Sequence, residues 1–217
     1  QGRVSNLQNL IKDKNLDGTV GIAHTRWATH GVPSDVNAHP HLDNSKEFAV
    51  VHNGIIENYL ELKNFLKNKG YNFLSETDTE VVPNLIHYYY HNGANSVLEA
   101  ISKAIKDLQG SYALEIITPF EPDKIFVARN ESPVVIGKGN NEIYIASDIQ
   151  ALISKTNKFY FIDDKEIAVV TKENVDFYDI DLNRVNVDLK DIDWAASSCE
   201  KNGYEDYMLK EIFEQPT

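Results

Sequence analysis

Apolar residues recur at helical spacing in the first half of the chain. Between residues 96 and 108 they form a stripe that an amphipathic helix buries against a core. Ser96 and Glu99 have the spacing of a capping box at the start of this helix, and Gly110 follows its end. Similar spacing and capping signals predict three further helices. Ser5 with Gln8 marks the start of the helix at residues 5–16, and Gly70 follows the helix at 57–69. Thr77 with Glu80 marks the start of the helix at 77–92, and Gly93 follows its end.

After Gly110 the pattern changes to short runs of β-branched and aromatic residues separated by turn residues. Asp148 is placed to cap a short helix within this strand-rich part. Two earlier apolar runs, at residues 20–23 and 48–51, predict buried strands joined by a polar loop. The later runs predict strands at residues 112–118, 124–128, 134–137, 143–146, 159–162, 167–170 and 175–178.

A block of helices followed by a block of strands predicts packed sheets covered by helices, which is an α+β sandwich. Beyond residue 181 the polar content rises. We interpret residues 191–202 as a linker that precedes a helix at residues 204–213.

Composition narrows the possible functions. The chain has 217 residues, of which 42% are hydrophobic and 25% charged, as in ordinary globular proteins. No stretch approaches the roughly 18 consecutive apolar residues of a membrane span, and the first residues do not resemble a signal peptide. The net charge of -12 disfavours nucleic-acid and anionic membrane partners. A single cysteine, Cys199, excludes an internal disulfide, which fits a reducing compartment. Taken together, these features lead us to expect a cytoplasmic protein that binds neither nucleic acid nor membrane.

Three clusters of polar residues stand beside predicted strand ends, where binding sites tend to gather. They are residues 24–31 (HTRWATHG), 52–54 (HNG) and 75–80 (SETDTE). An arginine and an aspartate on separate loops can hold the carboxylate and ammonium of an amino acid. An Asn-Gly pair can offer an amide and an unhindered backbone N–H to a developing oxyanion.

Each of these residues also has a plainer explanation when it is considered singly. Arg26 can pair with a surface acid, Asn53 with Gly54 can form a hairpin turn, and Asp78 can cap its helix. His39 and His41, with His30 and His52, could suggest a metal site, but we favour a structural, hydrogen-bonded role. Trp27 has the alternative of a core aromatic.

Taken together, the clusters and the segments 37–41 (NAHPH) and 51–58 (VHNGIIEN) resemble one family in wording and order. The family is the glutamine–fructose-6-phosphate amidotransferases, and weaker resemblance extends to residues 207–216. The resemblance implies a four-layer αββα sandwich of the N-terminal-nucleophile hydrolase type, lacking its first strands. It assigns residues 1–193 to an N-terminally truncated glutaminase domain, and 194–217 to a linker toward an absent sugar-phosphate isomerase domain.

The same resemblance implies that L-glutamine is hydrolysed by an N-terminal cysteine and that ammonia passes to fructose 6-phosphate. The products would be glucosamine 6-phosphate and glutamate, made by a full-length homodimer without a cofactor or metal. By motif position Arg26 binds the α-carboxylate and Asp78 the α-ammonium, while Asn53 and Gly54 form the oxyanion hole. Thr29 and His30 line the pocket, and Trp27 lies on a loop that closes over glutamine.

The chain departs from the family pattern at its first residue, which is Gln1 where the family has the nucleophilic cysteine. Cys199 has its amine in a peptide bond and lies in the predicted linker, so we assign it no catalytic role. We therefore expect these 217 residues alone to be inactive. Two alternatives stay open: another class II glutamine amidotransferase, of the phosphoribosyl or asparagine-forming type, or a glutamine-binding regulatory module without catalysis.

Overall fold

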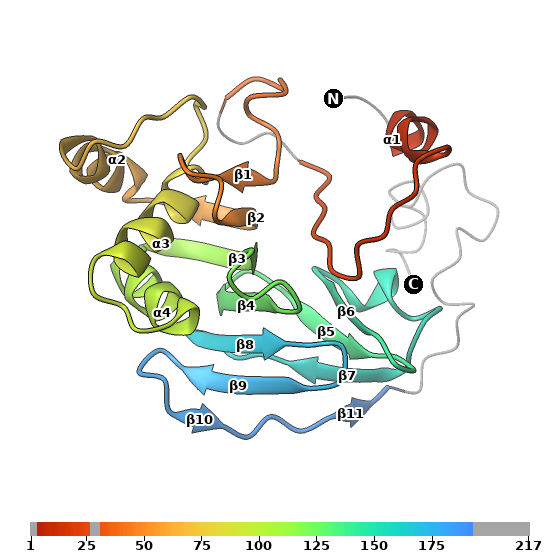
Figure 1. Cartoon of the computed structure of the whole chain (residues 1–217). Coiled ribbons are helices and arrows are strands. Elements are labelled where there is room, and N and C mark those ends of the chain that lie inside the picture. The colour runs from red at the N-terminus through yellow and green to blue at the C-terminus, as the bar shows by residue number, and fades with distance from the viewer. Residues whose placement is uncertain (1–3, 27–30, 193–217) are drawn as a thin grey trace, which may run out of the picture.

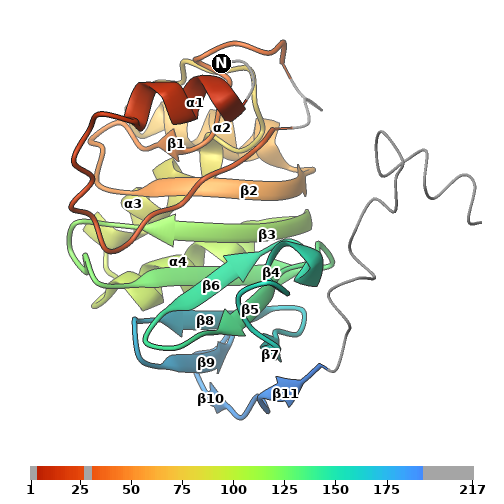
Figure 2. The same ribbon diagram turned by 90° about the vertical axis from the view of Figure 1, so that its right-hand side faces the viewer.

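A computed structural model describes residues 4–26 and 31–192. Antiparallel strands in two stacked sheets form its centre, and three helices pack on the outer face of the larger sheet (Figures 1 and 2). The helices are α1 Val4–Ile11, α2 Tyr59–Asn68, α3 Val81–His91 and α4 Val97–Asp107, with a 3₁₀ turn, η1, at Ile149–Ala151. The strands are β1 His41–Leu42, β2 Ala49–Ile56, β3 Gly110–Ile117, β4 Ile125–Asn130, β5 Val135–Lys138, β6 Ile143–Ala146, β7 Lys158–Phe161, β8 Glu166–Val170, β9 Val175–Asp179, β10 Arg184–Val185 and β11 Lys190–Asp191.

The larger sheet has seven strands in the order β1-β2-β3-β4-β8-β9-β10, and the smaller has four in the order β11-β7-β5-β6. Figure 2 looks onto the larger sheet, with α2, α3 and α4 behind it and β5, β6 and β7 in front. One apolar core lies between the helices and the larger sheet, and a second lies between the two sheets. The predicted α+β sandwich with stacked sheets is therefore confirmed.

The outer face of the smaller sheet is covered, within the described residues, by η1 and the turn after it. Leu152 packs there against Val135 and Phe159, and Ile149 joins the same cluster. Asp148 caps η1 by accepting the backbone N–H of Gln150 at 2.7 Å, as the sequence predicts. After the helices and the two sheets, the fourth layer of the described part of the chain is therefore this short 3₁₀ turn.

Helix α4 follows its prediction closely. The Ser96 side chain accepts the backbone N–H of Glu99 at 3.1 Å and so supplies one missing partner at the first turn. The stripe of apolar residues is buried against the sheet: Val97, Ile101, Ala104, Ile105 and Leu108. Helix α2 likewise ends before Gly70, whose φ of +93° suits glycine after a helix.

Three local predictions are wrong. Residues 20–23 form no strand, because no described strand pairs with them and an apolar run needs a partner for its backbone groups. Helix α1 includes Ser5 as a helical residue, so Ser5 is not its cap, and the helix ends at Ile11. Thr77 does not cap α3, because Glu80 occupies that position and makes no side-chain capping bond.

No helix in the described part of the chain has the length and apolar character needed to cross a bilayer. The predicted helix at residues 204–213 and nearly all of the predicted linker lie outside the described residues. Asp191, the first residue of that linker, belongs to β11, which pairs with β7.

Candidate active site

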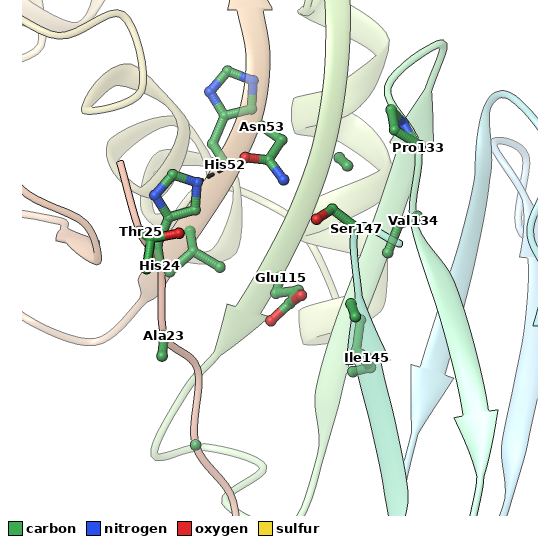
Figure 3. A pocket seen from close by; sticks show the side chains of 14 residues that line it. Ala23, His24, Thr25, His52, Asn53, Glu115, Pro133, Val134, Ile145 and Ser147 are labelled. Carbon is green, nitrogen blue, oxygen red and sulfur yellow. Dashed lines mark hydrogen bonds between the residues drawn. The ribbon is translucent and has the colours of Figure 1, made fainter. Parts of the chain in front are cut away.

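A cavity of about 180 Å³ lies where residues 24–26, strand β2 and the turn before α3 meet. Its walls carry the predicted site residues that the structure describes: Arg26, Asn53, Gly54 and Asp78. A second cavity, of about 430 Å³, shares several of its lining residues and reaches between the two sheets (Figure 3). The fold thus brings together predicted site residues that are up to 52 positions apart in the sequence, from Arg26 to Asp78.

Asn53 and Gly54 lie inside β2 and not in a hairpin turn. Asn53 stands opposite Ala113 of β3, and Gly54 stands opposite Tyr112. The residues on either side of the pair continue in the same strand, so the chain does not reverse there. The hairpin explanation of the Asn-Gly pair is therefore wrong.

Gly54 is required by the backbone at this point of the sheet. Its φ is +126°, a region that side chains disfavour. A Cβ atom added there would lie 2.1 Å from the carbonyl oxygen of Ser111 and 2.8 Å from Oγ of Ser132. Close strand packing alone therefore explains why this residue is glycine.

The side-chain amide of Asn53 faces the larger cavity. Its Oδ1 lies 2.7 Å from Nε2 of His24, and because an amide oxygen only accepts, Nε2 carries the proton. Figure 3 shows the amide nitrogen pointing into the cavity between Asn53 and Ser147. Among the residues that the structure describes, none accepts a hydrogen bond from this nitrogen, so the site presents an amide donor to a ligand.

A chain of hydrogen bonds continues from His24 through His39 and Thr79 to His52. The Nδ1 atoms of His24 and His39 are 3.1 Å apart, His39 Nε2 is 3.1 Å from Thr79 Oγ1, and His52 Nδ1 is 2.9 Å from the same hydroxyl. One arrangement of protons satisfies these four links: each of His52, Thr79, His39 and His24 donates to the next group, and Asn53 accepts last. It leaves Nε2 of His52 without a proton toward the Ser111 carbonyl oxygen, which is 3.5 Å away. The tautomers are thus assigned from the network.

This arrangement needs neutral imidazoles, and burial favours that state for His39 and His52. Burial, with a smaller contribution from neighbouring His24, lowers the pKa of His39 to about 2. Burial also lowers the pKa of His52. His41 Nε2 is 3.0 Å from the hydroxyl of Thr77, and burial lowers the pKa of His41 to about 4. These contacts support the hydrogen-bonded interpretation of His39 and His41.

Asp78 is a buried carboxylate tied to the end of β2. It is 3% exposed, and its Oδ2 accepts the backbone N–H of Ile56 at 2.8 Å. The plainer explanation that Asp78 only caps its helix is wrong, because Glu80 holds the cap position and the Asp78 carboxylate accepts from β2. The Arg26 guanidinium donates to the carbonyl oxygens of Gly31 at 3.1 Å and Val32 at 3.5 Å.

Glu80 stabilises the turn that presents Asp78 and Thr79. Its carboxylate accepts the backbone N–H groups of Leu74 at 2.9 Å and Ser75 at 2.7 Å, and the Ser75 hydroxyl at 2.6 Å. The spacing of Thr77 and Glu80 predicts a helix cap, but in the structure Glu80 binds the backbone of the preceding turn instead. Charge-assisted bonds of this kind fix the backbone on which the site is built.

Sequence reasoning did not find the roles of Thr79, His24 and Glu115. Thr79 and His24 are within the quoted motifs, but only the fold shows that they connect to Asn53. Glu115 lines the larger cavity, and burial raises the pKa of its carboxyl to about 7. One acidic residue within the apolar run at residues 112–118 was the available signal. Trp27, Thr29, His30 and Cys199 lie outside the described residues.

A model of the glutamine amidotransferase domain family matches residues 24–154, which include every lining residue of the smaller cavity. The chain belongs to this glutamine amidotransferase family. Curated relatives named glutamine–fructose-6-phosphate aminotransferase [isomerizing] are 49% identical in Clostridium acetobutylicum and 50% in Clostridium perfringens, each over 216 residues. A third, from Caldanaerobacter subterraneus subsp. tengcongensis, is 51% identical. All three matches cover 100% of this chain and 35% of the relative, so the chain spans about a third of their length.

Solved structures agree with the family assignment. The glutamine phosphoribosylpyrophosphate amidotransferase from B. subtilis, complexed with ADP and GMP, matches 74% of this amidotransferase chain and 35% of its own, with a TM-score of 0.61 and 25% identity. A structure described as the allosteric regulatory enzyme of purine biosynthesis matches 68% of the chain and 32% of its own, with a TM-score of 0.58 and 25% identity. The predicted fold of the N-terminal-nucleophile hydrolase type is confirmed.

Proposed function

We propose that this chain is the glutamine-hydrolysing part of a glutamine–fructose-6-phosphate aminotransferase. One observation carries the proposal: Arg26, Asn53, Gly54 and Asp78, which the motifs assign to glutamine, line one small cavity. The name carried by relatives about half identical over the whole chain supports the sugar-phosphate acceptor. Residues 1–193 would form the glutaminase domain, and 194–217 would lead to a domain that binds fructose 6-phosphate.

In this proposal glutamine is held by the two charged groups on its α-carbon. The Arg26 guanidinium would bind the α-carboxylate, and the buried Asp78 carboxylate would bind the α-ammonium, since opposite charges form strong hydrogen bonds in a partly buried site. Thr29 and His30 would add contacts to the substrate, and Trp27 would close over it. The side-chain amide of glutamine would then extend toward Asn53.

The reaction requires a nucleophile, which we assign to a cysteine outside these 217 residues. Its sulfur would attack the amide carbon of glutamine, ammonia would leave, and water would release glutamate from the thioester. Negative charge on the former carbonyl oxygen would be stabilised by the Asn53 amide and the Gly54 backbone N–H. Ammonia would pass to fructose 6-phosphate, giving glucosamine 6-phosphate.

A comparison of two nitrogen donors tests the proposal in the full-length protein. Arg26→Ala and Asp78→Ala should weaken synthesis of glucosamine 6-phosphate from glutamine while leaving synthesis from added ammonia near the wild-type rate. Arg129→Ala is a matched control, because Arg129 bonds the carbonyl oxygens of Ser132 and Ile162 and lines neither cavity of the site. Equal loss with both nitrogen donors would remove the assignment.

A further inference from the structure

Two histidines of α3 converge on one carboxylate at the protein surface. His87 and His91 are one helical turn apart, and their rings are 4.4 Å apart between centroids. Glu47, which lies just before β2, places its Oε2 atom 2.6 Å from His91 Nε2 and 3.4 Å from His87 Nε2. None of the three lines either cavity of the candidate active site. This cluster therefore has no part in the function proposed above.

We propose that Glu47, His87 and His91 bind a divalent transition-metal ion of the zinc type. One ligand atom from each of the three lies within 4.8 Å of the others. Bonds of about 2.0–2.1 Å in a tetrahedral site place neighbouring ligand atoms about 3.3 Å apart. The contact between Glu47 and His87 already has this length.

The contact between Glu47 and His91 has to open by about 0.7 Å to reach the same separation. Both side chains can make this adjustment, because that of His91 is 45% exposed and that of Glu47 is 29% exposed. Two imidazoles and one carboxylate are a known ligand set for zinc, with water in the fourth position. Imidazole nitrogens also favour zinc, nickel and copper over magnesium and calcium, which prefer oxygen.

Groups behind the cluster hold two of the ligands in place. The Tyr71 hydroxyl is 2.6 Å from His87 Nδ1, which leaves Nε2 directed toward Glu47. Asp43 accepts the backbone N–H of Glu47 at 2.7 Å and so fixes the loop that carries it. Metal-binding histidines are commonly oriented by such a partner on the second ring nitrogen.

A simple surface ion pair does not account for the arrangement as well. Such a pair joins one imidazolium to one carboxylate and contributes little to stability. Here two imidazole nitrogens share one Glu47 oxygen, and the next carboxylate, Asp43, is 3.9 Å from His87 Nε2. Protonating both imidazoles would place two like charges on rings 4.4 Å apart. A divalent ion can be coordinated by all three groups without that repulsion.

Zinc titration of the full-length protein tests the site. After treatment with EDTA, ZnCl₂ binding is measured by calorimetry for the wild type, His91→Gln and Glu47→Gln. The control is Glu173→Gln, which removes the negative charge of an exposed side chain on another loop. We expect one zinc ion per chain at this cluster, with Kd raised at least about 10-fold by either ligand substitution and unchanged by the control. Saturation at about 100 times Kd should raise the Tm of the wild type by roughly 5–10 °C.

Circular dichroism of each variant establishes that it is folded before its affinity is compared. Zinc bound at another place, such as a cysteine thiol, would be equally tight in the wild type and in His91→Gln. That result, or the absence of zinc binding, would overturn the proposal. Displacement of zinc by equimolar MgCl₂ would also overturn it, because the site would then lack the assigned preference for imidazole ligands.

Discussion

His24 Nε2 and Asn53 Oδ1 lie 2.7 Å apart, and this contact determines which way the Asn53 amide faces. With the oxygen held by His24, the nitrogen is turned toward the cavity. A donor fixed before the reaction helps the transition state without reorganising during it. The contact therefore connects His24, of the polar cluster at residues 24–31, to the proposed chemistry at Asn53.

Asn53→Ala in the full-length protein should lower kcat for glutamine hydrolysis by about 10²–10³, as other single oxyanion donors do. KM for glutamine should change much less, because charge develops only in the transition state. Steady-state glutaminase kinetics on folded protein measure both. The matched control is Asn130→Ala, which removes an amide bound to the Gly110 carbonyl oxygen. An unchanged kcat for the Asn53 variant would end the oxyanion assignment.

Thr79→Val should lower kcat about 10-fold, because it removes the hydroxyl between His39 and His52 and leaves one ring nitrogen of each without a partner. Thr79→Ser should restore activity. Thr77→Val is the control, since that hydroxyl bonds His41 and Ser75 and lies outside the chain to Asn53. If the two valine variants lose kcat equally, the effect belongs to packing of the turn and not to the hydrogen-bond chain.

Glu115→Gln should change how stability depends on pH. Burial raises the carboxyl pKa from 4.5 to about 7, so the folded protein binds a proton that the unfolded chain has released. The stability contribution of this group is present below about pH 4.5 and is lost as the pH rises to about 7. The variant should therefore be more stable than the wild type by about 1–3 kcal/mol at pH 8, with little difference at pH 4.5.

Urea unfolding at both pH values measures this effect. Glu61→Gln, which changes an exposed carboxylate on α2, should leave the pH dependence as it is. An identical pH dependence in wild type and Glu115→Gln would contradict the assigned pKa.

A polypeptide of these 217 residues should release no ammonia from glutamine, because binding residues and an oxyanion donor do not replace a nucleophile. Cys199→Ala should leave this result unchanged. Ammonia detection with millimolar glutamine makes the test. Ammonia release that disappears in Cys199→Ala would assign that thiol a catalytic role.

Local patterns predicted most of the regular elements. The capping of α4 by Ser96 and of η1 by Asp148 depends on residues within one turn, so it can be inferred from sequence. Strands β5 to β9 follow apolar runs bounded by turn residues. Strands β1, β10 and β11 have only two residues each, and pairing defines them more than composition does.

The site could be predicted only in part. Resemblance selected Arg26, Asn53, Gly54 and Asp78, and the cavity brings them together. The sequence could not show that Thr79 lies between His39 and His52, because that contact requires residues 27 and 40 positions away. Nor could it show that Gly54 faces the Ser111 carbonyl oxygen across a sheet.

The pairing of β2 with β3 sets the order in which parts of the site become mobile. Asn53 and Gly54 lie within eight paired positions, so their backbone is released only when the sheet opens. Residues 24–26 belong to no helix or strand and can separate from the sheet at a smaller cost in free energy. We expect slow amide hydrogen exchange at Val51, Asn53 and Ile55, whose N–H groups face β3, and faster exchange at residues 23–26. In the proposed function, the substrate-binding groups would then admit glutamine and release glutamate while the Asn53 amide remains in place.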